Sequence, residues 1–162
     1  MISRILRKPK DLHFEHTYSA PIDTVWQAWT DPEMLRHWWG PEGTAVITCE
    51  VDAVVEGEIH VVTEAGESMG KYAGTRWPMH GVFTRVTPTQ ELSYDARSWT
   101  EGEEAGSTIH HTNTVRLRSE GSSTVVTLDV AITAIGPKAK MAAFGMKWGY
   151  KSQLKALEEV LA

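Results

Sequence analysis

Alternating apolar and polar positions dominate the chain and begin close to its start. Within residues 11–19, Phe14 and Tyr18 fall on one side of an extended chain, while His13 and Glu15 fall on the other. Side chains in a β-strand alternate between two faces, so a period of two is typical of a half-buried strand. The pattern therefore predicts a first strand over residues 11–19.

Six further strands are predicted from β-branched and aromatic runs separated by short segments rich in Gly, Pro, Ser or acidic residues. They cover residues 44–51, 57–63, 77–86, 92–99, 108–117 and 124–133. Their short spacing is typical of a largely antiparallel meander. The polar segments 64–75 and 100–107 contain glycine, and we expect exposed loops there.

Two short helices are expected between the first and second strands. Pro21 suits the first position of a helix, where a missing N–H costs nothing. Val25, Ala28 and Trp29 follow at the spacing of one helical face, which is the pattern of an amphipathic helix. The first helix is therefore predicted to start at Ala20.

Asp31 and Pro32 repeat this start signal and predict a second helix, since an Asp cap and a first-turn proline both favour helix initiation. The apolar stripe of this helix consists of Leu35, Trp38 and Trp39, and a Gly-Pro pair ends it. The two helices interrupt a chain that is otherwise rich in strands.

The longest helical pattern follows the last predicted strand. Tyr150, Leu154, Leu157 and Leu161 recur at i, i+4, i+7 and i+11, which is typical of a helix packed along a sheet. The predicted architecture is a strand, two short helices, six strands and a long helix. This order of elements indicates an α+β fold.

Met141, Phe144 and Trp148 form a second stripe on the long helix, because residues three and four apart are neighbours on a helix surface. Apolar side chains at this spacing usually fill a core, and we favour that interpretation for at least part of the stripe. The alternatives are a wall of an internal cavity or a contact with a second subunit in a homodimer.

Composition narrows the class of protein. With 162 residues, 41% of them hydrophobic, the chain can bury one core without a disulfide or metal, and we expect one domain over residues 11–162. A net charge of -5 disfavours nucleic acid as a partner, since phosphate binding needs a concentrated basic face. Basic residues gather only in residues 1–10, which we interpret as a solvated tail.

Cys49 is the one cysteine of the chain, which excludes an internal disulfide. It shares a predicted strand face with Ile47 and Val51, and we interpret it as a buried structural thiol, because apolar surroundings suppress thiolate formation. No run of 18 apolar residues and no signal-like segment occurs, which argues against membrane insertion. Together these observations favour a cytoplasmic location.

Two other candidate sites have simpler explanations. His110 and His111 are adjacent in a predicted strand and point to opposite faces, so one metal ion cannot bind both without distortion. Glu50 and Asp52 share a strand face and offer a carboxylate pair for proton transfer, but exposure at a strand end explains them better. The chain has no phosphate loop, dinucleotide fingerprint or zinc signature, and we expect neither a metal nor a cofactor.

Several short motifs follow one another in the order seen in a known family. They are A-P at residues 20–21, W-x-x-W-T-D-P at 26–32, W-W-G-P at 38–41, C-E-x-D at 49–52, W-P-x-x-G-V-F at 77–83 and G-Y-x-x-x-L-x-x-L at 149–157. With the order of elements, they resemble the activator of heat-shock-protein-90 ATPase homologue-like branch of the START/birch-pollen-allergen (SRPBCC) superfamily over residues 12–161. The departures from its usual pattern are Glu56, Thr44 and Tyr150, where Gly, an aromatic residue and Trp are usual.

The resemblance implies a helix-grip fold, in which a curved seven-stranded antiparallel sheet wraps around a long C-terminal helix and a cavity between them binds apolar molecules. The phase of one strand adds that His111 and Asn113 share a face with apolar Ile109 and Val115, which makes them polar groups on an inward surface. The candidate cavity residues are Trp39, Trp77, Met79, Phe83, Tyr94, His111, Asn113, Phe144 and Trp148.

Three classes of function follow. We favour a binder of a small apolar molecule, with His111 or Asn113 orienting its polar end. The second class is an enzyme of the polyketide cyclase or dehydratase kind with His111 as acid or base, but no catalytic dyad is legible and we lean against it. The third class, a chaperone-regulating interaction module, is implied by the family resemblance alone.

Overall fold

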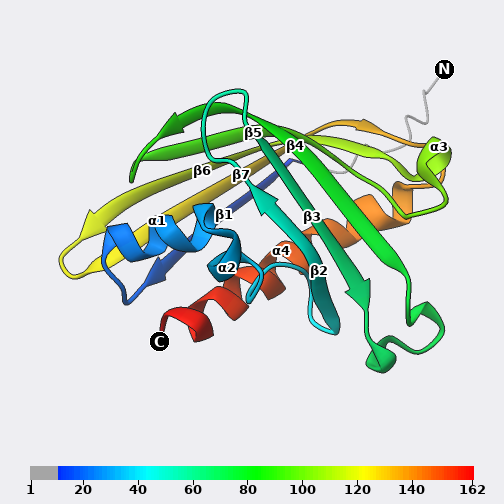
Figure 1. Cartoon of the computed structure of the whole chain (residues 1–162), viewed down its shortest axis with the longest axis horizontal. Coiled ribbons are helices and arrows are strands. Elements are labelled where there is room, and N and C mark those ends of the chain that lie inside the picture. The colour runs from blue at the N-terminus through cyan, green and yellow to red at the C-terminus, as the bar shows by residue number, and fades with distance from the viewer. Residues whose placement is uncertain (1–10) are drawn as a thin grey trace, which may run out of the picture.

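The computed structural model describes residues 11–162, and these residues form a seven-stranded sheet curled over a long helix (Figure 1). The predicted basic tail, residues 1–10, lies outside the described residues. The elements are β1 (Leu12–Tyr18), α1 (Ile22–Thr30), α2 (Pro32–Leu35), β2 (Thr44–Val51), β3 (Glu58–Ala65), η1 (Glu67–Tyr72), β4 (Arg76–Thr87), β5 (Glu91–Ser98), α3 (Glu104–Ser107), β6 (Ile109–Glu120), β7 (Ser123–Ile135) and α4 (Lys140–Leu161).

The sheet has the strand order β1-β7-β6-β5-β4-β3-β2, and all neighbouring strands are antiparallel. β1 and β2 therefore lie at opposite edges, and the chain travels between them through α1 and α2. Figure 1 shows the curled sheet with α4 running across it. The prediction of an α+β helix-grip fold, with two short helices after the first strand, is confirmed.

The first helix begins at Ile22 rather than at the predicted Ala20. Pro21 takes the N-cap position with an extended backbone, φ -68° and ψ 153°, so its conformation lies outside the helix that it precedes. The second helix follows the predicted start signal, because the Asp31 side chain accepts a hydrogen bond from the Glu33 N–H at 2.9 Å. Its regular part ends at Leu35, and turns carry the chain onward.

The buried core joins both short helices to the sheet and to α4. Trp38 packs edge-on against Trp29 with ring centroids 4.6 Å apart, and its Nε1 donates to the Ala28 carbonyl at 2.9 Å. The hydroxyl of Tyr18, at the end of β1, donates to the Leu154 carbonyl of α4 at 2.9 Å. These contacts fix α1, α2 and α4 on one side of the sheet.

A β-bulge corrects the predicted surroundings of Cys49. The pairing of β2 with β3 shifts between Val46 and Thr48, and a bulge of one residue reverses which side chains face inward beyond it. Ile47 is consequently exposed, whereas Cys49 and Val51 pack against the core. The predicted shared face of Ile47 and Cys49 is wrong, and the thiol is half-buried rather than fully buried.

The buried face of α4 agrees with the predicted stripe of Tyr150, Leu154 and Leu157. The second predicted stripe is exposed: Met141, Phe144 and Trp148 are 84%, 52% and 57% accessible. The interpretation of this stripe as helical core is therefore wrong. These three side chains point away from the sheet, whereas the stripe that contains Tyr150 packs against it.

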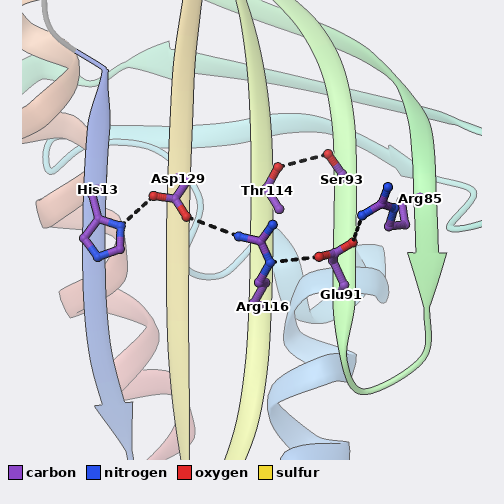
Figure 2. Close-up of polar contacts among 7 residues, drawn as sticks. All are labelled: His13, Arg85, Glu91, Ser93, Thr114, Arg116 and Asp129. Carbon is purple, nitrogen blue, oxygen red and sulfur yellow. Dashed lines mark hydrogen bonds and ion pairs between the residues drawn. The ribbon is translucent and has the colours of Figure 1, made fainter.

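The outer face of the sheet carries a row of ion pairs across five strands (Figure 2). Arg116 on β6 contacts Asp129 on β7 and Glu91 on β5. Asp129 also pairs with His13 on β1, and Glu91 with Arg85 on β4. These cross-strand contacts hold the pKa of Glu91 below its usual value, chiefly through the hydrogen bond from Arg85. Because they are largely solvent-exposed pairs, we interpret them as sheet stabilisation.

The two predicted exposed loops contain short helices. Residues 64–75 hold η1, and residues 100–107 hold α3, whose last residue, Ser107, is buried. Most of both segments is exposed, as predicted, but residues 64 and 65 belong to β3, and Ala65 and Ser107 are buried, contrary to that expectation. The Ser107 hydroxyl accepts a hydrogen bond from the Thr100 N–H at 2.9 Å, which closes the loop on itself. Within residues 11–162, no helix combines the length and apolar character needed to cross a bilayer.

Candidate functional site

A pocket of about 240 Å³ lies between α4, the ends of β4 and β5, and the loop after α2. Its wall is mostly apolar and aromatic. The lining residues are Trp39, Gly40, Pro41, Thr63, Trp77, Pro78, Met79, Ser98, Trp99, Thr100, Ser107, Ile109, Ala142, Gly145, Met146, Gly149, Tyr150 and Gln153. Three of the predicted cavity residues, Trp39, Trp77 and Met79, are thus brought together.

Two helix glycines leave room on the α4 side of this pocket. Among residues 11–162, a Cβ atom at Gly145 would have no neighbour within 4 Å, and one at Gly149 would meet only Pro41 at 4.0 Å. The two residues are one helical turn apart and both line the pocket. Side chains longer than the methyl group of alanine at these positions would extend into space that the present sequence leaves open.

A chain of hydrogen bonds runs behind the pocket wall and ends at it. The Ser98 hydroxyl lies 2.9 Å from His111 Nε2, and His111 Nδ1 lies 2.6 Å from Asn113 Oδ1. Asn113 Nδ2 in turn donates to the Tyr150 hydroxyl oxygen at 2.9 Å. His111 and Asn113 are buried, as the strand phase predicts, but they reach the pocket only through Ser98 and Tyr150.

The chemistry of these groups determines which atom donates and which accepts in each hydrogen bond. Burial lowers the pKa of His111 and keeps the ring neutral. An amide oxygen can only accept, so His111 Nδ1 carries the hydrogen, and Nε2 accepts from Ser98. The Tyr150 oxygen accepts from Asn113, and its own hydrogen is left to donate. Burial also raises the pKa of Tyr150 to about 12, so this hydroxyl stays protonated at neutral pH.

Gln153 is a third polar group of the pocket wall and is only 4% exposed. Its Oε1 accepts a hydrogen bond from the Gly40 N–H at 3.0 Å. Its Nε2 is buried and has no hydrogen-bond partner in residues 11–162. An unpaired buried donor is uncommon in folded proteins and calls for an explanation.

The other predicted cavity residues lie elsewhere. Phe83 and Tyr94 are fully buried and pack edge-on at 5.6 Å in the core. Phe144 is on the exposed face of α4, and Trp148 borders a separate open groove of about 1020 Å³ between α4, β1 and the loop after α2. That groove has lysine, histidine and glutamate side chains along it, unlike the pocket of uncharged residues.

Sequence reasoning missed several residues that form this pocket, including Ser98, Trp99, Gly149 and Gln153. A signal for Gln153 was present, since it falls beside Leu154 on the buried side of α4 and is a polar residue in an apolar stripe. A signal for the open space beside α4 was present as well. Gly145 and Gly149 lie inside a long helical pattern, where glycine lowers the stability of the helix, so their presence indicates a position at which a side chain is unfavourable.

The curled sheet, the helix that it grips and the pocket between them define a helix-grip domain of the START/SRPBCC type. A family model described as Activator of Hsp90 ATPase homolog 1-like protein matches residues 19–162. The chain belongs to this family, as the sequence motifs predicted.

Solved structures share the fold at low sequence identity. A Chromobacterium violaceum protein matches with a TM-score of 0.74 and 21% identity, over 94% of this chain and 98% of that chain. An Arthrobacter aurescens protein matches with a TM-score of 0.75 and 24% identity, over 94% of this chain and 86% of that chain. A Silicibacter pomeroyi protein whose title names the same family matches with a TM-score of 0.73 and 22% identity, over 93% and 96%. A search of curated proteins found no match.

Proposed function

We propose that this protein binds a small, mainly apolar molecule in the pocket between α4 and the sheet. The observation that carries the proposal is the pocket itself, which combines tryptophan and methionine side chains with a few buried polar groups. That combination is typical of ligand sites, where apolar surface provides affinity and a few polar groups provide orientation.

The size of the pocket limits the ligand. About 240 Å³ is the volume of roughly eight water molecules at about 30 Å³ each, which suits one aromatic ring with a short substituent. Burying about 200 Å² of apolar ligand surface provides about 5 kcal/mol. A gain of this size corresponds to a dissociation constant of about 0.2 mM, and because the cost of association reduces it, we expect an affinity of about 1 mM or weaker.

Binding is tested by titrating the ¹⁵N-labelled protein with α-methylstyrene and following its amide NMR signals. We expect shifts centred on Trp77, Ser98 and Gly149. Gly149→Leu should weaken binding at least tenfold, because a leucine side chain leans toward the preceding turn and fills the space beside Gly145. Gly149→Ala is the matched control, since it makes the same helix-favouring change without filling the pocket, and it should stay within about twofold of the parent protein.

Three outcomes would contradict the proposal. One is equal affinity of the parent protein and both Gly149 variants for α-methylstyrene. Another is a set of shifted signals centred on the exposed face of α4, around Phe144, instead of on the pocket. Absence of binding to the parent protein would equally refute it.

An acid–base enzyme of the polyketide cyclase or dehydratase kind is the second candidate. The observation in its favour is the 2.9 Å contact between His111 Nε2 and Ser98, whose side chain lines the pocket. Burial of His111 disfavours its protonated form, however, and a general base must accept a proton during turnover. We therefore place binding ahead of catalysis.

The family name supports a chaperone-regulating role by analogy only, and we place that role third. The proposal includes a cytoplasmic location, which the single half-buried thiol of Cys49 supports. The exposed stripe of Met141, Phe144 and Trp148 keeps a homodimer contact open as a prediction.

A further inference from the structure

Gln153 lines the pocket, and its Nε2 is a buried donor that has no partner within residues 11–162. Leaving such a group unpaired destabilises the folded protein, because the group loses its hydrogen bonds to water and gains none in return. Its neighbour Tyr150, three residues earlier on α4, already receives a hydrogen bond from Asn113. Among the described residues that line the pocket, Gln153 Nε2 is the buried side-chain nitrogen for which no hydrogen-bond partner is found.

The orientation of the Gln153 amide is fixed by the backbone of Gly40. The Gly40 N–H can only donate, so the side-chain atom that faces it at 3.0 Å must be the oxygen. The nitrogen is therefore the atom left for another partner. Reversing the amide would place two donors against each other and leave the oxygen unpaired.

We propose that the ligand is an uncharged, planar molecule whose acceptor oxygen, of the carbonyl type, receives a hydrogen bond from Gln153 Nε2. This inference rests on the proposed function, since it assumes that the ligand occupies this pocket. It adds the class of ligand: an aromatic or conjugated carbonyl compound rather than a hydrocarbon or an ion.

The side chains of the pocket wall are uncharged, and this favours an uncharged ligand. Tyr150 is the only titratable side chain among the described residues that line the pocket. Burial raises its pKa to about 12, so it is neutral at pH 7 and the wall carries no charged side chain. Burying an ion without an opposite charge costs several kcal/mol. Trp39 and Trp77 line the pocket, and aromatic side chains together with the limited volume favour a planar ring as the ligand.

A pair of probes of nearly the same shape isolates the hydrogen bond. Acetophenone has a carbonyl oxygen where α-methylstyrene has a methylene group, and both are conjugated molecules of nearly the same size. Benzoate adds a negative charge to the same ring. Affinities of all three probes are measured by NMR titration for the parent protein and for Gln153→Met, which keeps the length of the side chain and removes its donor.

In the parent protein, acetophenone is expected to bind at least as tightly as α-methylstyrene, although water solvates its carbonyl better. In Gln153→Met, the affinity for acetophenone should fall about tenfold relative to that for α-methylstyrene. The ratio of the two affinities cancels any general change of the pocket caused by losing the bond to Gly40. Benzoate should bind at least tenfold more weakly than acetophenone to both proteins.

A readout in the parent protein keeps the inference testable if Gln153→Met does not fold. Acetophenone labelled with ¹³C at the carbonyl should show a downfield shift on binding relative to its value in a hydrocarbon solvent, because a hydrogen bond to the oxygen deshields the carbon. A bound value equal to that in hydrocarbon would overturn the inference.

The inference and the proposed function fail in different ways. If α-methylstyrene binds in the pocket but acetophenone binds at least tenfold more weakly, or if the ratio is the same in Gln153→Met, the inference is wrong and the proposed function stands. Tighter binding of benzoate than of acetophenone would likewise refute the inference alone. If no probe binds the parent protein, both are wrong.

Discussion

The His111–Asn113 pair offers a quantitative test of the polar chain behind the pocket. His111→Leu and Asn113→Leu each remove one partner of the 2.6 Å contact between Nδ1 and Oδ1, and both sites are almost completely buried. The double variant removes both partners together. Leucine is close in volume to histidine and has the same branched heavy-atom skeleton as asparagine, so the variants change hydrogen bonding more than packing.

The expected magnitudes follow from which group is left without a partner. Asn113→Leu leaves the hydrogen of His111 Nδ1 without an acceptor, and His111→Leu leaves Asn113 Oδ1 without a donor. Each single variant should lower the free energy of unfolding by about 1–3 kcal/mol. Replacing both partners removes that penalty, so the double variant should cost at least 1 kcal/mol less than the sum of the two single variants.

Urea denaturation followed by tryptophan fluorescence measures all four proteins, and unchanged slopes show that the transitions are comparable. Loss of stability that is additive to within about 0.5 kcal/mol would refute the reasoning, because uncoupled sites do not share a hydrogen bond. A double variant that is less stable than the sum predicts would refute it as well.

Three further predictions concern the core, the thiol and the pH dependence. Trp38→Ala should lower the free energy of unfolding by about 3–5 kcal/mol, and Trp39→Ala should cost clearly less, because Trp38 is fully buried and Trp39 is only half-buried; equal costs in denaturant melts would contradict this. Cys49 should react slowly with a disulfide reagent at pH 7 and rapidly in denaturant, because burial raises the pKa of its thiol to about 11, and equal rates in both conditions would count against it. Burial holds the pKa of His111 below 6.5 in the folded protein, so the unfolded chain binds a proton at this residue at a higher pH than the folded protein does. The free energy of unfolding should therefore decrease as pH falls below about 6.5, by at most about 1.4 kcal/mol per pH unit. His111→Leu should show a flatter pH dependence of stability between pH 6.5 and 5, and a slope identical to that of the parent protein would argue against this reasoning.

Much of the fold was predictable because local signals and the global arrangement agree. Alternation predicted the seven strands, and Asp31 predicted the start of α2, whose cap it forms. Cys49 shows the limit of such reasoning, because the bulge at Val46 arises from the pairing of two strands and leaves no mark in the spacing of one. Phe144 shows another limit: helical spacing reveals which residues share a face, but the face that meets the sheet is decided by tertiary packing.

The candidate site was predictable only in part. Trp39, Trp77 and Met79 were expected to line the cavity and lie together in the pocket. His111 was correctly expected to point inward, but Ser98 lies between it and the pocket. That relation depends on the register of β5 against β6, in which Ser98 and His111 are not directly opposite, and no single-strand pattern contains this information.

The placement of β1 at one edge of the sheet determines when the fold can close. β1 pairs only with β7, with Leu12 opposite Val130, so its first hydrogen-bonding partner emerges from the ribosome more than a hundred residues later. At about 5–20 residues per second, the strand waits on the order of ten seconds during synthesis. The hydroxyl of Tyr18 waits longer still, for Leu154. Such late, long-range contacts make folding slow and expose an unpaired strand to other nascent chains.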